Sequence, residues 1–187
     1  LHPKAHKALV KRTTKPGQSA GGRFRGKSSQ YSLQLREKQK VKRLFGLLER
    51  QFSNLMKEAS RTQGQSGQVL LQLLEQRADN VVYRAGFAPS RRAARQLVTH
   101  GHFMINRRRF DVPSLRVKPG DELTIRDHSK KTDYFSRLDD VSPSPEQTVS
   151  WLKTDRKKFN VKMVALPPRE EAEPDINEQL IVEYYSR

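Results

Sequence analysis

The chain has 187 residues, enough for one domain or two small ones, and its 37 Lys and Arg against 20 Asp and Glu give a net charge of +17. So large a basic excess favours a polyanionic partner, either nucleic acid or an anionic membrane surface. Cysteine is absent, which excludes disulfides, thiol nucleophiles and thiolate zinc sites, and no apolar run is long enough to span a bilayer. The basic faces described below lack the bulky apolar companions of a membrane-surface helix, so we expect no membrane partner.

Residues 1–30 contain eight Lys or Arg and no acid, and they end in the run KPGQSAGGRFRGKSSQ. Glycine, serine and scattered charge without apolar periodicity are typical of an extended basic arm. We expect this arm to become ordered on RNA, where its cations can neutralise phosphates.

Residues 31–61 carry an apolar stripe at helical spacing, which predicts one amphipathic helix with a basic opposite face. The stripe consists of Val41, Leu44, Phe45, Leu48, Phe52 and Leu55. Residues 69–76 (VLLQLLEQ) predict a second, strongly apolar helix that packs on the first. Residues 1–50 hold 14 basic residues against two acids, so the basic face favours RNA contact over simple solvation.

The segment from residue 80 to 110 has seven arginines and neither acid nor lysine. Ser90 is a predicted N-cap and Gly101 a predicted C′ residue, which leaves a helix of about three turns. Its apolar face is expected to contain Ala93, Ala94, Leu97 and Val98. The opposite face contains Arg91, Arg92, Arg95, Gln96 and Thr99.

Residues 79–85 predict a short preceding helix, joined by a Gly- and Pro-containing turn in a helix-turn-helix-like arrangement. Residues 102–106 and 122–126 predict strands, with a turn over residues 107–109. The result is a module of two helices on a small antiparallel sheet, with arginines from helix and loop projecting together. Such arginines can bind two phosphate oxygens or stack on unpaired bases, so irregular RNA fits better than a DNA major groove.

The C-terminal third is less informative. Residues 149–152 and 159–165 predict strands that complete the sheet, Trp151 is expected in the core, and part of residues 133–138 is expected to be helical. Residues 168–187 hold six acids and end in a predicted helix whose apolar face includes Ile176, Leu180, Ile181 and Tyr184.

The run DNVVYRAGFAPSRRAARQLVTHGHFMIN resembles the RNA-binding module of ribosomal protein S-four, some pseudouridine synthases, a bacterial tyrosyl-tRNA synthetase and a small heat-shock RNA binder. The flanking runs YSLQLREKQKVKRLFGLLERQF and DINEQLIVEYYSR are similar to the S-four family of small-subunit ribosomal proteins alone. This resemblance covers residues 16–187 and implies an α+β fold. A helical domain, residues 31–76 completed by 167–187, would hold the inserted module, residues 77–166, behind the arm of residues 1–30.

The resemblance further implies a primary binder of small-subunit ribosomal RNA that nucleates assembly. It would lie near the mRNA entry path, where contact with the neighbouring protein S-five influences translational accuracy. The expected location is a cytoplasmic ribosome, and the sequence does not distinguish it from an organellar one. The residues expected to contact RNA are Tyr31, Arg36, Lys38, Lys40, Lys42, Arg43, Arg91, Arg92, Arg95, Gln96, Arg107, Arg108 and Arg109.

The chain departs from the family at Asn106-Arg107, where Asn-Gly is usual, and this leaves the geometry of that turn open. We expect no enzyme, no metal and no cofactor. His100 and His102 have no third ligand nearby, and the glycine motifs of nucleotide-binding loops are absent. The alternative function is a free regulatory RNA binder, either a translational repressor of its own operon or a stress-type protein. An RNA-modifying enzyme is disfavoured because the helical flanks leave no room for a catalytic domain.

Overall fold

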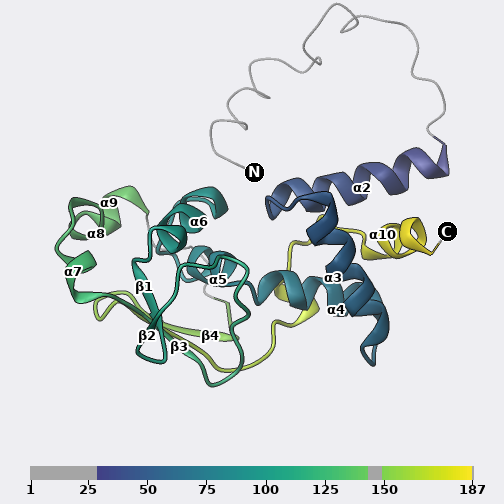
Figure 1. The fold of residues 1–187 in the computed structure, drawn as a ribbon. Helices are drawn as coiled ribbons and strands as arrows, with labels where there is room; N and C mark the ends of the chain where they lie inside the picture. The colour runs from purple at the N-terminus through teal and green to yellow at the C-terminus, as the bar shows by residue number, and fades with distance from the viewer. Residues whose placement is uncertain (1–28, 143–148, 187) are drawn as a thin grey trace, which may run out of the picture.

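The structure is a computed structural model that describes residues 29–142 and 149–186. The predicted arm therefore lies outside the described residues, apart from Ser29 and Gln30. In Figure 1, helices α2, α3, α4 and α10 form one side of the molecule, and the sheet with α5 to α9 forms the other.

Two helices, α2 (Gln30–Leu44) and α3 (Glu49–Arg61), replace the single helix predicted over residues 31–61, so that prediction is wrong. Gly46 ends α2 with a φ of 64°, a left-handed conformation that glycine adopts without a Cβ clash. The N–H groups of Gly46 and Leu47 donate to the carbonyls of Arg43 and Lys42, which is the Schellman pattern. Because the chain turns here, Leu47 is buried and Leu48 is 72% exposed.

The helical side has its own apolar core, to which both ends of the described chain contribute. Helix α4 (Ser66–Glu75) packs on α3, and α10 (Glu178–Tyr185) packs on α2 and α4. Figure 1 shows α10 beside α2, although nearly the whole chain separates them in sequence. A 3-10 turn, η2 (Arg169–Glu171), precedes α10. The buried cluster comprises Val41, Phe45, Leu47, Phe52, Met56, Ala59, Leu70, Leu71, Leu74, Ala172, Ile176 and Ile181.

The module begins with α5 (Ala78–Arg84) and α6 (Arg91–Thr99). Both predicted ends of α6 are confirmed. The Ser90 hydroxyl accepts a hydrogen bond from the Ala93 N–H at 3.2 Å, and Gly101 follows the helix with a φ of 71°. Three short helices, α7 (Asp127–Lys130), α8 (Asp133–Ser136) and α9 (Leu138–Val141), lie after the third strand. Helix α8 confirms that part of residues 133–138 is helical.

The sheet contains β1 (Phe103–Ile105), β2 (Arg108–Arg109), β3 (Glu122–Ile125), β4 (Leu152–Asp155) and β5 (Asn160–Met163). Its order is β2-β1-β3-β5-β4, and every neighbouring pair is antiparallel. The strand predicted at residues 149–152 starts only at Leu152. Trp151 is 1% exposed, which confirms it as a core residue.

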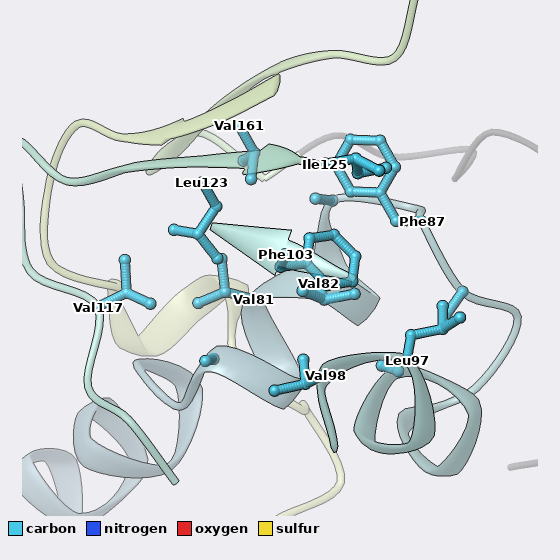
Figure 2. Packing of buried hydrophobic residues seen from close by; sticks show 14 of the residues in the cluster. Val81, Val82, Phe87, Leu97, Val98, Phe103, Val117, Leu123, Ile125 and Val161 are labelled. Carbon is cyan, nitrogen blue, oxygen red and sulfur yellow. The ribbon is translucent and has the colours of Figure 1, made fainter. Parts of the chain in front are cut away.

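One face of the sheet is covered by α5 and α6. Figure 2 shows Phe103 and Leu123 of the sheet directed toward Val81 of α5 and Val98 of α6. Burial alternates along β3, where Leu123 and Ile125 are buried and Glu122 is exposed. This pattern is typical of a sheet with one covered face. The α+β fold class is therefore confirmed. The domain boundaries at residues 30, 76 and 166 stay predictions.

No helix in the part of the chain that the structure describes is long and apolar enough to cross a membrane.

We expect Gly67→Ala to destabilise the helical side by about 1–3 kcal/mol, because a Cβ there would lie 2.6 Å from Glu178 Cγ and 2.9 Å from its Cβ. Arg169 holds the Glu178 carboxylate at 2.9 Å, which restrains that side chain from moving aside. Helix propensity alone predicts the opposite sign. Urea unfolding is the measurement, with the exposed helical substitution Ser60→Ala as the control. An unchanged or higher stability for Gly67→Ala would contradict the tight α4–α10 contact.

Candidate RNA interface

The outer side of α6 presents a polar stripe to solvent. Arg92, Gln96 and Thr99 follow one another at spacings of four and three residues, and all three are exposed. Within residues 29–142 and 149–186, the Arg92 guanidinium makes no ion pair or hydrogen bond, so its five donors are free for an external anion.

The β1–β2 hairpin carries three more arginines. Asn106 and Arg107 form its two-residue turn with φ values of 47° and 67°, which answers the open question about this turn: both residues are left-handed, as in a type I′ turn. Arg108 and Arg109 belong to β2 and not to a loop, because they pair with Ile105 and Met104. A left-handed conformation costs a residue such as arginine about 1–2 kcal/mol.

Arg109 connects the hairpin to α6. Its Nε and Nη2 atoms lie 2.9 Å from the position that a Cβ on Gly101 would occupy, so its guanidinium rests over the C-terminal end of α6. A cation is favourable at this end of a helix dipole. Arg109 therefore connects the hairpin to the C-terminal end of α6. Arg108, its neighbour in β2, leaves the ribbon on the opposite face, and Arg107 lies at the tip. We call the exposed residues Arg92, Gln96, Arg107, Arg108 and Arg109 of α6 and the hairpin the arginine surface.

On α2, the residues predicted to contact RNA occupy different environments. Arg36 and Arg43 are exposed, and no ion pair of theirs occurs among the described residues. Tyr31 is 48% exposed, and its ring centroid lies 5.8 Å from that of Tyr184. Lys40 is exposed as well, but its ammonium pairs with Glu37 at 3.2 Å and donates to the Asp175 carbonyl.

Lys38 and Lys42 were predicted to contact RNA, but their ammonium groups are already paired within the protein. Their ammonium groups donate to the two carboxylate oxygens of Glu49 at 2.8 and 2.9 Å, and Lys38 is 4% exposed. Burial acts to lower the pKa of Lys38, but hydrogen bonds to Glu49 and Tyr184 outweigh it and the pKa lies above its usual value. Burial likewise acts to raise the pKa of Glu49, yet hydrogen bonds from Lys38, Lys42 and Tyr185 lower it to about 2.

Arg91 is also directed into the protein. Its Nε donates to Asn80 Oδ1 at 2.8 Å and its Nη2 to Glu173 at 2.6 Å. The guanidinium lies 4.7 Å from the Phe45 ring centroid and 4.6 Å from that of Tyr83, a cation–π arrangement on both sides. Burial acts to raise the pKa of Glu173, but Arg91 and Arg84 outweigh it, so this pKa lies below its usual value.

Arg95 joins the module to the turn between α2 and α3. It donates to Asp79 Oδ2 at 2.7 and 2.9 Å, to the Gly46 carbonyl at 2.5 Å and to the Phe45 carbonyl at 3.1 Å. Asp79 accepts from Arg77 as well, at 3.0 and 3.1 Å. With its donors occupied in this way, Arg95 is held between the two halves of the molecule.

Glu75 is the most deeply buried acid of this junction, with 1% exposure. Its carboxylate accepts from Arg84 at 2.8 and 2.9 Å and from Asn80 at 2.7 Å. The charge pattern of residues 80–110 does not predict these partners, because Glu75 and Asp79 precede that segment and Glu173 lies far beyond it. We call the set Glu75, Arg77, Asp79, Asn80, Arg84, Arg91, Arg95 and Glu173 the junction network.

The two histidines make a local contact. Their ring centroids are 6.0 Å apart, and His102 Nδ1 lies 3.0 Å from the buried Ser129 hydroxyl. Burial, His100 and Arg126 all lower the pKa of His102, which favours its neutral form. No group of three or more His, Asp or Glu that could hold a metal ion occurs in the described ranges.

Comparison with known proteins identifies the family. Residues 1–75 match the model for the "Ribosomal protein S4/S9 N-terminal domain", and residues 76–123 match the model for the "S4 domain". The chain is 46% identical to the small ribosomal subunit protein uS4 of Chlorobaculum tepidum, over 100% of the chain and 91% of that protein. It is 48% identical to the protein of the same name from Chloroflexus aurantiacus, over 98% and 90%. The chain belongs to the uS4 family. The resemblance noted in the sequence is thereby confirmed, and all five residues of the arginine surface lie within the stretch that matches the S4 domain.

We expect Arg91→Ala to lower the free energy of unfolding by about 2–4 kcal/mol, because Glu173 and Asn80 would each lose a buried partner. The neighbouring Arg92→Ala should change it by less than about 0.5 kcal/mol, since Arg92 is exposed. Urea unfolding of both variants is the measurement. Equal stability losses would contradict the assignment of these two arginines to the inside and the outside of the molecule.

We expect part of the acid sensitivity of folding to arise from Glu49. Its folded-state pKa of about 2 lies below the usual 4.5, so its stabilising effect is complete above pH 4.5 and is lost as the pH falls toward 2. The free energy of unfolding should therefore drop less between pH 6 and pH 3 in Glu49→Gln than in the unchanged protein. An identical drop in both would show that Glu49 has no part in the pH dependence.

Proposed function

We propose that this protein is a primary binder of small-subunit ribosomal RNA, which it engages through the arginine surface and the outer face of α2. Its membership of the uS4 family makes it a structural, non-enzymatic constituent of the small ribosomal subunit. The finer proposal is that its binding nucleates assembly of the surrounding RNA.

The observation that carries this proposal is the separation of two sets of arginines within one short segment. Arg91 and Arg95 are neutralised inside the junction network, whereas Arg92, Arg107 and Arg108 are exposed and no ion pair of theirs occurs among the described residues. Free guanidinium groups on a firmly folded surface are suited to phosphate oxygens and to the faces of unstacked bases. The proposed RNA-contact residues are therefore Tyr31, Arg36, Lys40, Arg43, Arg92, Gln96, Arg107, Arg108 and Arg109.

Lys38, Lys42, Arg91 and Arg95, which the sequence also placed at the interface, would act indirectly. Their charged groups are occupied by Glu49, Glu173 and Asp79, so they orient the helices that carry the exposed cations. Any contact that they make with RNA would come in addition to these pairs.

The proposal extends to neighbours that the family resemblance suggests. These are the ribosomal protein S-five and mRNA at the entry path, with an influence on translational accuracy, in a cytoplasmic ribosome. They rest on that resemblance alone. The regulatory alternative, in which the same surface binds an mRNA away from the ribosome, becomes an outcome of the binding experiment.

Binding of the purified protein to a small-subunit ribosomal RNA 5′-domain fragment, across a salt series with bulk tRNA as competitor, tests the function. We expect binding that survives the competitor, and Arg92→Ala should weaken it and reduce the salt slope by about one ion. Arg61→Ala, an exposed arginine outside the proposed set, is the control. If tRNA displaced the fragment at equal concentration, the protein would be a generic polycation, and a preference for its own mRNA would favour the regulatory alternative.

A further inference from the structure

The turn at the tip of the β1–β2 hairpin holds an arginine in an unfavourable backbone conformation. Asn106 tolerates a φ of 47°, because asparagine is one of the few residues that visit the left-handed region readily. Arg107 at 67° occupies a position where glycine is strongly preferred. Its side chain is exposed and makes no ion pair or hydrogen bond with any residue that the structure describes, so no contact of the Arg107 side chain itself offsets the strain.

A set of hydrogen bonds from Asn106 fixes this turn against β3. The Asn106 amide Nδ2 donates to Asp121 Oδ1 at 2.8 Å, and the Glu122 N–H donates to Asn106 Oδ1 at 3.1 Å. The Asn106 N–H also donates to the Glu122 carbonyl at 2.9 Å. Both polar atoms of the asparagine side chain are thus used to hold the turn. We call the Asn106 and Asp121 side chains, with these bonds, the turn clasp.

The clasp is itself anchored in the sheet. The second carboxylate oxygen of Asp121 accepts from the Lys118 N–H at 2.8 Å, across the turn that contains Gly120. The Gly120 N–H donates to the Met163 carbonyl at 2.8 Å, and the Met163 N–H donates to the Asp121 carbonyl at 3.0 Å. The hairpin tip is therefore connected through Asp121 to β5, in addition to β2, whose described pairing covers only two residues.

We propose that Asn106 and Asp121 are positioning residues that hold Arg107, together with Arg108, in a fixed orientation for a phosphate of the bound RNA. This inference rests on the proposed function and adds a specific task within it. Fixing the backbone beneath an exposed cation before binding reduces the conformational entropy lost on binding, so the arginine contributes more affinity than it would on a mobile loop. Backbone strain that the surrounding hydrogen bonds maintain is expected at a position that acts on a ligand.

The simpler reading is that the clasp only stabilises the hairpin. Two substitutions separate the readings. Asn106→Gly keeps a residue that favours positive φ but removes both side-chain bonds of the clasp. Arg107→Gly relieves the strain, leaves the clasp in place and removes the guanidinium. A purely structural clasp would affect RNA binding in the same way whether or not Arg107 is present.

The experiment measures RNA affinity and its salt dependence for both single variants and the double variant, with the 5′-domain fragment and with bulk tRNA. We expect Arg107→Gly to match or exceed the melting temperature of the unchanged protein, while its affinity falls about fivefold and its salt slope decreases by about one ion. Asn106→Gly should lower affinity severalfold on its own and have almost no further effect when Arg107 is already glycine. Lys157→Gly, which removes a cation from the exposed β4–β5 turn, is the matched control and should combine additively with Asn106→Gly.

Two results would overturn the inference. One is an unchanged affinity and salt slope in Arg107→Gly on both RNAs, and the other is full additivity of the Asn106 and Arg107 substitutions. If Asn106→Gly fails to fold, Asp121→Asn takes its place in the same set of single and double variants, because it weakens the turn clasp from its other side. Failure of the proposed function would give a different result, because the unchanged protein would then bind the 5′-domain fragment and tRNA equally well. The non-additivity of the Asn106 and Arg107 substitutions could still be measured with tRNA in that case.

Discussion

The arrangement of the whole molecule depends on one buried carboxylate that requires hydrogen-bonding partners. Glu75 is almost fully buried, and a buried charge without partners would cost far more free energy than a domain of this size can spare. Arg84 and Asn80 satisfy it, and Asn80 in turn accepts from Arg91, which continues the junction network to Glu173. This network occupies the space between two apolar cores and gives their junction a defined geometry, which apolar contacts alone would specify less sharply.

Because α6 contributes to both the network and the outer surface, the two functions of its arginines are coupled. Arg91 and Arg95 point inward and fix the helix relative to the α2–α3 turn, while Arg92 and Gln96 point outward. A rotation of α6 by one residue, about 100°, would bring Arg92 and Gln96 to the places of Arg91 and Arg95, and the buried Asp79 carboxylate would lose the guanidinium of Arg95. The internal ion pairs thus determine which way the exposed cations of the module face relative to those of α2.

Local chemistry in the sequence was sufficient to predict several elements of the module. The Ser90 cap, the glycine after α6, the strand at residues 122–125 and the buried position of Trp151 all follow from rules that act over a few residues. The break at Gly46 was missed because the apolar stripe continues through it in sequence, although the chain does not continue as one helix. The interior arginines were missed for another reason: Arg91 and Glu173 are 82 residues apart, and a local count of charge cannot detect such a pair.

The two cores differ in the stretch of chain that each one requires. Among the described residues, all buried members of the module core lie between residues 78 and 163, whereas the helical core needs Ala172, Ile176 and Ile181 from near the C-terminus as well as Val41. During synthesis, the helices that are made first must therefore wait for the residues that are made last. The module, although it is made second, has all of its apolar partners earlier, so we expect it to fold first on the ribosome and to serve as the platform on which the N-terminal helices and α10 close.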